Sequence, residues 1–271
     1  MELRPIFTVA AKEFHDRIRN RWVLAVALVF TVFSLVIAYF GSAQQGQIGF
    51  RSIEITIASL VSLVIYLIPL IALLLGFDAI VGERERGSLD LLLAMPITRT
   101  ELLLGKYLGL ALALTLSTVA GFSLVAVLLW RYMNSAALLH YSGFVLSSVL
   151  LGLAFLSVAI FLSVLARDRA RASGLAIMIW FFFVLVFDLL LLGLLVTTGE
   201  HFSGDAFAWL LLLNPADVFR ILNIFSLDDV RTLYGLASVV PAYLGSAAVM
   251  GGVKLLWIIV PLILAKWRFK P

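Results

Sequence analysis

Six long apolar runs limit the possible folds of this chain more than any other feature of its sequence. Each run is close to the ~20 residues that an α-helix needs to cross the hydrocarbon core of a bilayer. Hydrophobic residues make up 63% of the 271 residues and charged residues only 13%, a composition that no soluble domain of this size buries. The sequence therefore predicts an all-α, polytopic membrane protein that forms a single domain over residues 1–271. The predicted transmembrane helices are residues 22–40, 55–77, 107–129, 142–165, 174–196 and 244–265.

A dense run of charge separates the second apolar run from the third. It belongs to the segment 82–99, which reads G-E-R-E-R-G-S-L-D-L-L-L-A-M-P-I-T-R. Acidic and basic side chains alternate at its start, and they are too polar to enter hydrocarbon. We therefore expect Glu83 and Glu85 to be exposed and to have no packing role, so that replacing both with alanine leaves the bundle folded.

The second half of this segment has the pattern of a short helix. Ser88 is a good helix N-cap, and Asp90 in the first turn suits the positive end of the helix dipole. Leucines then recur at helical spacing until Pro96 ends the helix; they are Leu89, Leu92 and Leu93. The pattern predicts an amphipathic helix along the membrane surface, with its leucines against the bundle. An ordinary solvated loop between two spans is the alternative.

The same segment resembles the signature of ABC-2 type transporter permeases. The resemblance is carried by the pattern E-x-E-x-G-[T/S]-x-x-x-L-L-x-x-P, followed by Arg99, Glu101 and Lys106. In that family this stretch is the cytoplasmic coupling helix, which docks into a separate ATPase subunit. The resemblance implies that ATP and Mg²⁺ bind to that partner, and that this chain is a permease with no cofactor of its own. The coupling residues that it implies are Glu83, Arg84, Glu85, Arg86, Gly87, Ser88 and Leu89.

Nothing in the sequence points to catalysis within this chain. There is no cysteine, no HExxH motif and no plausible Ser/His/Asp set. The spacing Gly82-x-x-x-x-Gly87-Ser88 lacks the lysine and the preceding strand of a phosphate-binding loop. The methionines are scattered and do not favour a copper site. We therefore predict no catalytic and no metal-binding residue.

The N-terminal residues 1–21 have the composition of an interfacial helix. Apolar residues share one helical face, and the basic residues sit elsewhere, which suits an anionic membrane surface. The apolar residues are Phe7, Ala11, Phe14 and Ile18. The family resemblance implies the same helix beside the ATPase, and a simple topogenic charge cluster is the alternative.

The distribution of basic residues predicts the orientation of the chain. The N-terminus, the segments 78–106 and 166–173, and the C-terminal tail together hold 15 of the 20 Lys and Arg residues. Because basic residues gather on the cytoplasmic side, both termini and the segment 82–99 are predicted to be cytoplasmic. We expect a multi-pass protein of the bacterial inner membrane.

A ladder of small residues runs along the third apolar run. A small residue recurs at every fourth position, at Gly105, Gly109, Ala113, Ser117 and Gly121. Such a ladder lets two helix backbones approach closely in lipid. Packing within one bundle and a seam between two copies are both compatible with it.

The outer segment 197–243 contains a strong helix start. Asn214 can cap a helix, Pro215 suits its first position, and Asp217 suits its first turn. We predict that Asn214, Pro215, Asp217 and Arg220 form a docking edge for an extracytoplasmic partner. A lid that only packs on the bundle is the alternative. Further acids of this segment are Glu200, Asp205, Asp228 and Asp229.

Two opposite charges lie within the apolar runs. Asp188 is deep in the fifth run, where an unpaired acid costs at least ~3 kcal/mol. Lys254 lies at a similar depth in the sixth run, so we predict that the two form an ion pair. Alternatively, Lys254 snorkels towards water and Asp188 has a role of its own.

Several strings outside the coupling segment resemble a narrower group, the membrane subunits of Nos transporters. They include F-V-L-V-F-D-L at 183–189 and W-L-L-L-L-N-P-A-D-V-F-R at 209–220. The resemblance implies two permease copies, two copies of a NosF-like ATPase and a periplasmic NosD-like protein, which together support maturation of the copper–sulfur site of nitrous oxide reductase. An exporter of an unrelated small molecule or lipid, and a passive membrane anchor, remain as alternatives.

Overall fold

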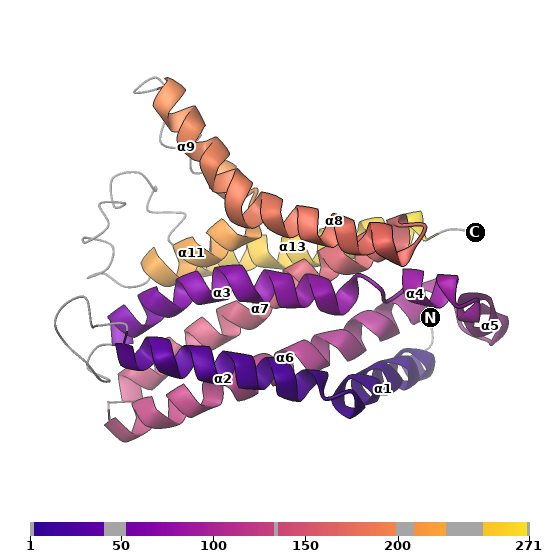
Figure 1. The fold of residues 1–271 in the computed structure, drawn as a ribbon, viewed down its shortest axis with the longest axis horizontal. Coiled ribbons are helices and arrows are strands. Elements are labelled where there is room, and N and C mark those ends of the chain that lie inside the picture. The colour runs from indigo at the N-terminus through magenta and orange to yellow at the C-terminus, as the bar shows by residue number, and fades with distance from the viewer. Residues whose placement is uncertain (1–2, 41–52, 133–134, 199–208, 226–245, 270–271) are drawn as a thin grey trace.

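The computed structural model of the protein describes residues 3–40, 53–132, 135–198, 209–225 and 246–269 (Figure 1). All regular structure in these ranges is helical, and six stretches are long and apolar enough to cross a membrane. The predicted all-α, polytopic class is therefore confirmed. Of the outer segment 197–243, the acids Glu200, Asp205, Asp228 and Asp229 lie outside the described residues.

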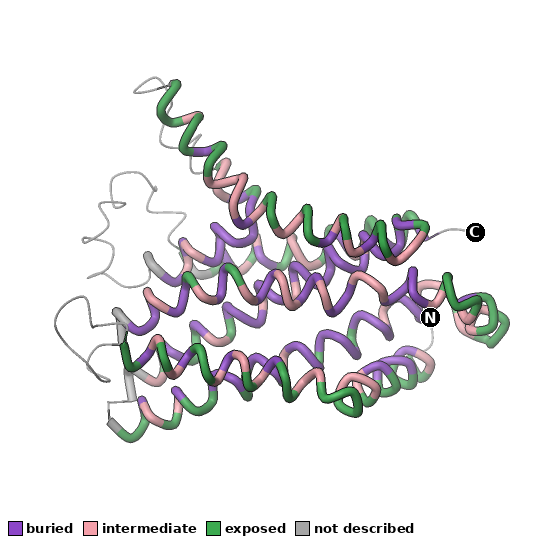
Figure 2. Tube along the Cα trace, in the orientation of Figure 1, coloured by how far each residue is buried: buried purple, intermediate pink, exposed green. Residues whose placement is uncertain are grey.

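Long helices lie side by side and form the bundle (Figure 1). They are α2 (Trp22–Phe40), α3 (Ile53–Gly76), α6 (Arg99–Tyr132), α7 (Ser135–Leu165) and α13 (Ala247–Arg268). Helix α7 occupies the centre, because it packs against α3, α6 and α13 at once. Its residues Leu151, Phe155 and Ile160 are completely buried, and the buried positions gather on the inner faces of the bundle (Figure 2).

The N-terminal helix α1 (Leu3–Arg19) packs on the first half of α6. A Cβ added at Gly105 would lie 2.7 Å from Cβ of Val9, and one added at Gly109 would lie 2.5 Å from the carbonyl oxygen of Ala10. Further along α6, Gly121 faces Phe30 of α2 in the same way. The small-residue ladder therefore packs helices within this chain, which is the first of the two predicted alternatives.

The buried face of α1 differs from the predicted apolar face. Ile6, Val9 and Ala10 contact the bundle, whereas Phe7 and Ile18 of the predicted face are exposed. The helix thus has one apolar side for the bundle and a second apolar side facing away from it, which suits a helix that lies at a membrane interface.

The fifth apolar run is interrupted where a single span was predicted. It consists of α8 (Arg169–Phe181), a π-helical turn η2 (Phe182–Val186) and α9 (Phe187–Thr198). A π-helical turn is a common cause of a bend within a helix. Figure 1 shows the result, since α8 lies along the bundle and α9 points away from it. No proline or glycine marks this bend in the sequence.

A short helix of the outer segment is inserted into the bundle. Helix α11 (Pro215–Phe225) packs against α3, α7 and α13. It begins where the sequence predicted a helix start, and Val218, Phe219 and Ile221 are buried. Its apolar face therefore belongs to the core of the outer half of the bundle.

The close approach of α1 to α6 leads to a testable prediction. Gly109→Ala should lower the free energy of unfolding by ~1–3 kcal/mol, because the new methyl group meets backbone atoms that cannot move away. Gly174→Ala is the matched control, since no atom lies within 4 Å of a Cβ at that helical position. Thermal unfolding of the two purified variants measures the difference, and equal stability would contradict the packing described.

Candidate functional site

The segment that resembles a coupling helix lies at the end of the bundle where both termini are found (Figure 1). It consists of α4 (Val81–Glu85), a turn at Gly87 and α5 (Ser88–Ala94). Gly87 has φ 70°, and a Cβ there would meet nothing within 4 Å. Glycine is needed at this position for its backbone conformation, which lets the chain reverse between two short helices.

Ser88 has a different role from the predicted one. Gly87 is the N-cap of α5, and no side chain caps the helix. The Ser88 hydroxyl instead donates to the Glu83 carboxylate and approaches the Glu83 carbonyl oxygen at 3.2 Å. The prediction that Ser88 caps the helix is wrong, because Gly87 occupies the N-cap and Ser88 is already the first helical residue.

Helix α5 has the predicted amphipathic character. Leu89 is buried, and Leu92 and Leu93 pack partly against the core. The helix ends at Ala94, just before Pro96. On its other side Leu91 is 72% exposed. Leu91 is therefore an exposed apolar side chain on the face of α5 that points away from the core.

Three charged residues from α1, α4 and α6 meet in one place. We call them the lysine cluster: Glu13, Glu83 and Lys106. The Lys106 Nζ lies 2.5 Å from the Glu13 carboxylate and 3.1 Å from the Glu83 carboxylate. The Lys106 side chain is only 3% exposed, and that of Glu83 is 15% exposed. The expectation that Glu83 is free of packing is therefore wrong, because it is one of two anions that compensate a buried cation.

Further bonds attach α4 to the neighbouring ends of α7 and α8. The Arg84 guanidinium donates to the carbonyl oxygen of Ala166 at 2.7 Å, and the Glu85 carboxylate accepts from the backbone N–H of Arg169 at 2.7 Å. The Ser163 hydroxyl accepts from the backbone N–H groups of Ile80 and Val81. Of the predicted coupling residues, Arg84, Glu85, Arg86 and Gly87 are exposed.

Helix α6 begins with a capping box that was not predicted from the sequence. The Thr98 N–H donates to the Glu101 carboxylate at 2.9 Å, and the Glu101 N–H donates to the Thr98 hydroxyl at 3.2 Å. The spacing Thr98-x-x-Glu101 is the sequence signature of this motif. It fixes the start of the helix that carries Lys106.

A second charged group lies in the outer half of the molecule, and we call it the outer ion cluster: Asp188, Asp217 and Arg220. The Arg220 guanidinium lies 2.9 Å from the Asp188 carboxylate and 2.5 Å from the Asp217 carboxylate. It therefore joins α9 to α11. The Asp188 side chain is 38% exposed, whereas that of Asp217 is 1% exposed.

Asn214 connects α11 to the π-helical turn. Its side-chain oxygen accepts from the Ala216 N–H at 3.0 Å, and its amide donates to the Phe183 carbonyl oxygen at 2.8 Å and to the Asp217 carboxylate at 2.9 Å. A π-helical turn departs from the α-helical hydrogen-bond pattern. The Asn214 amide thus caps one helix and satisfies a carbonyl group at the bend of another.

The predicted ion pair between Asp188 and Lys254 is wrong. Asp188 pairs with Arg220, and the Lys254 ammonium donates to the Ser147 carbonyl oxygen at 3.2 Å and lies 5.0 Å from the centre of the Phe219 ring. Similar depth in the bilayer did not make the two residues neighbours, because α11 supplies a different cation for Asp188. Lys254 is 1% exposed and does not snorkel.

The predicted docking residues lie mostly inside the bundle. Asn214, Pro215 and Asp217 are buried, and Arg220 is partly exposed. Their hydrogen bonds hold α11 in place, so a substitution at Asp217 acts first on this network. Their part in docking stays a prediction.

The fold and the coupling segment place the chain in a known class. The family model described as ABC-2 family transporter protein matches residues 7–271, so the chain belongs to this family and is a permease of an ABC transporter. It is 49% identical over 227 residues to a protein of Pseudomonas aeruginosa, with 82% of each chain covered. It is 43% identical over 272 residues to a protein of Stutzerimonas stutzeri, with 99% of each chain covered. Both relatives are described as "Probable ABC transporter permease protein NosY".

The lysine cluster gives a prediction about stability. Lys106→Met should lower the free energy of unfolding by ~3 kcal/mol, because two carboxylates are left buried without their cation. Adding Glu13→Gln and Glu83→Gln to the same variant should recover most of this loss, since the neutral triple variant buries no charge there. Denaturant unfolding of the three proteins measures both steps, and an unchanged Lys106→Met variant would contradict the cluster.

The outer ion cluster is tested by two double-mutant cycles. Asp188→Asn and Arg220→Gln should show a coupling energy of about 1 kcal/mol, a value kept small because both side chains are about one-third exposed. Asp188→Asn and Lys254→Met should be additive within ~0.5 kcal/mol. A strong coupling in the second cycle and none in the first would restore the pair that the sequence suggested.

Proposed function

We propose that this permease couples ATP hydrolysis by a separate, NosF-like ATPase subunit to export or mechanical work at the periplasmic side. In this proposal the work supports assembly of the copper–sulfur site of nitrous oxide reductase. The names of the two relatives and the strings at 183–189 and 209–220 support this destination. The observation that carries the coupling role is the lysine cluster, which ties the coupling segment to two other helices.

The bonds around α4 supply a route for force. A closing ATPase pair pushes on the exposed surface of the coupling segment, where Arg86 follows α4 and Leu91 lies on α5. Because Glu83 shares Lys106 with Glu13, the push reaches α1 and α6 together. Because Arg84 is bonded to the end of α7, the same push reaches the central helix of the bundle. The helices then carry the motion towards the outer half.

The proposed assembly contains two copies of this chain in the bacterial inner membrane, with the ATPase on the cytoplasmic side. Both termini and the coupling segment lie at one end of the bundle, as an even number of spans requires (Figure 1). That end carries most of the basic residues, which supports its cytoplasmic placement. A periplasmic NosD-like protein would then dock at the opposite end, near α11 and the partly exposed Arg220.

The coupling role is tested with one exposed and one conservative substitution. Leu91→Asp should lower the stimulation of the ATPase subunit by this chain by roughly tenfold, which corresponds to about 1.4 kcal/mol of lost contact. Leu91→Met should retain the stimulation, because it keeps an apolar side chain of similar size. ATP hydrolysis by the purified ATPase, with and without each variant, is the measurement, and an unchanged melting temperature shows that Leu91→Asp leaves the bundle folded.

Two outcomes separate this proposal from its alternatives. An ATPase that is indifferent to the presence of the chain would indicate a passive anchor. Stimulation that is lost in Leu91→Asp, together with normal nitrous oxide reductase maturation in cells that carry this variant, would indicate an exporter of an unrelated substrate.

A further inference from the structure

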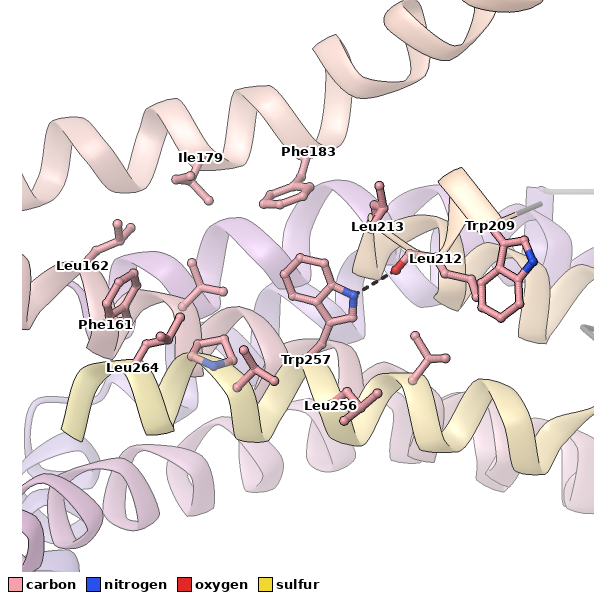
Figure 3. A pocket seen from close by; sticks show the side chains of 14 residues that line it. Phe161, Leu162, Ile179, Phe183, Trp209, Leu212, Leu213, Leu256, Trp257 and Leu264 are labelled. Atoms are coloured by element: carbon pink, nitrogen blue, oxygen red, sulfur yellow. Dashed lines mark hydrogen bonds between the residues drawn. The ribbon is translucent and has the colours of Figure 1, made fainter. Parts of the chain in front are cut away.

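An apolar groove of about 540 Å³ lies between α7, α8 and α13 (Figure 3). One wall is a stripe of α13 with helical spacing: Val253, Leu256, Trp257, Val260, Pro261 and Leu264. The opposite wall includes Ile179 of α8 and Phe183 of η2, and Phe161 of α7 closes the base. All three helices belong to stretches that are able to cross a membrane, so the groove lies at hydrocarbon depth.

The walls offer almost nothing to water. The indole N–H of Trp257 is directed to the Leu212 carbonyl oxygen at 3.1 Å, which is the dashed line in Figure 3. Because the N–H is bonded there, Trp257 presents the apolar part of its ring to the groove. A water molecule in a protein needs two to four polar partners, and an empty apolar space forfeits dispersion contacts. A hydrocarbon group is therefore the occupant that such walls favour.

The length of the groove matches one leaflet of a bilayer. From Val253 to Leu264 the stripe is ~16 Å long by helical rise. This is about half of the ~30 Å hydrocarbon core, or the depth of one leaflet. The stripe therefore matches the length over which one acyl chain lies within a leaflet.

Positive charge borders one end of the groove. The stripe ends at Leu264, and α13 continues directly to Lys266 and Arg268, which are both exposed. Basic side chains at the membrane surface attract the phosphate groups of anionic lipids. Trp267 between them is 66% exposed, as is common for tryptophan at the level of the headgroups.

We propose that the groove binds one acyl chain of an anionic phospholipid from the leaflet that borders Lys266 and Arg268. The chain lies along α13 against Trp257, and the headgroup lies beside the two basic residues. The bound lipid fills the space between α8 and α13 and so supports the position of α8 below the bend at η2. This inference does not depend on the substrate or the partners of the transporter.

Filling the groove tests the proposal directly. Leu256→Trp places a large side chain in the groove, and Leu255→Trp places the same side chain on a neighbouring exposed position that does not line it. Native mass spectrometry of the full chain, purified in detergent, counts the phospholipids retained per copy. We expect Leu256→Trp to lose a phospholipid that the parent protein and Leu255→Trp both retain. Equal retention of phospholipid in both variants would overturn the proposal. A Leu256→Trp protein that becomes monomeric and keeps its phospholipid would also overturn it, because the groove would then be an interface between two copies.

A fluorescence measurement on the parent protein tests the same site without relying on the folding of Leu256→Trp. Phospholipids brominated on the acyl chain should quench Trp257, read as the difference between the parent protein and Trp257→Phe. Brominated phosphatidylglycerol should quench more than brominated phosphatidylcholine, and Lys266→Gln with Arg268→Gln should remove this preference. Absence of quenching at Trp257 would overturn the acyl-chain site, and equal quenching by the two lipids would overturn the assignment of the headgroup.

Discussion

A single buried lysine holds together the end of the molecule that carries the proposed coupling role. Lys106 lies on α6, and its two carboxylate partners lie on α1 and α4. A buried charge is costly unless it is paired, so the three helices cannot separate without exposing or isolating one of these groups. The small residues Gly105 and Gly109 bring α1 close enough to α6 for Glu13 to reach the lysine. The coupling segment is thus part of a rigid three-helix unit.

The outer half uses a different arrangement, in which α11 takes the central position. Asn214 binds the bend of the fifth span, and Arg220 binds the start of α9. Phe219 of the same helix lies over the ammonium group of Lys254. One short helix thereby supplies partners for polar groups of the fifth and sixth spans. A movement of α11 would therefore reach both spans.

The sequence predicted those features that depend on local pattern. Hydropathy located the spans, Asn214 and Pro215 located the start of α11, and leucine spacing located α5. Contacts between distant segments were not predictable in this way. Glu83 is only partly exposed because Lys106 and Glu13 lie beside it. Asp188 pairs with a residue of the outer segment rather than with Lys254, because depth along a helix does not specify the direction of a side chain. The bend at η2 had no local signal, since its carbonyl partner comes from Asn214.

The rigidity of the three-helix unit is the central claim, and a distance measurement tests it most directly. The chain contains no cysteine, so spin labels attach only at introduced sites, and Ala11 of α1 and Arg86 at the end of α4 are both exposed. Double electron–electron resonance on the transporter, assembled with one labelled copy, should give one narrow distance distribution that is the same with and without ATP. A distribution that shifts or broadens when ATP is added would show that α1 and α4 move separately, and would contradict the account.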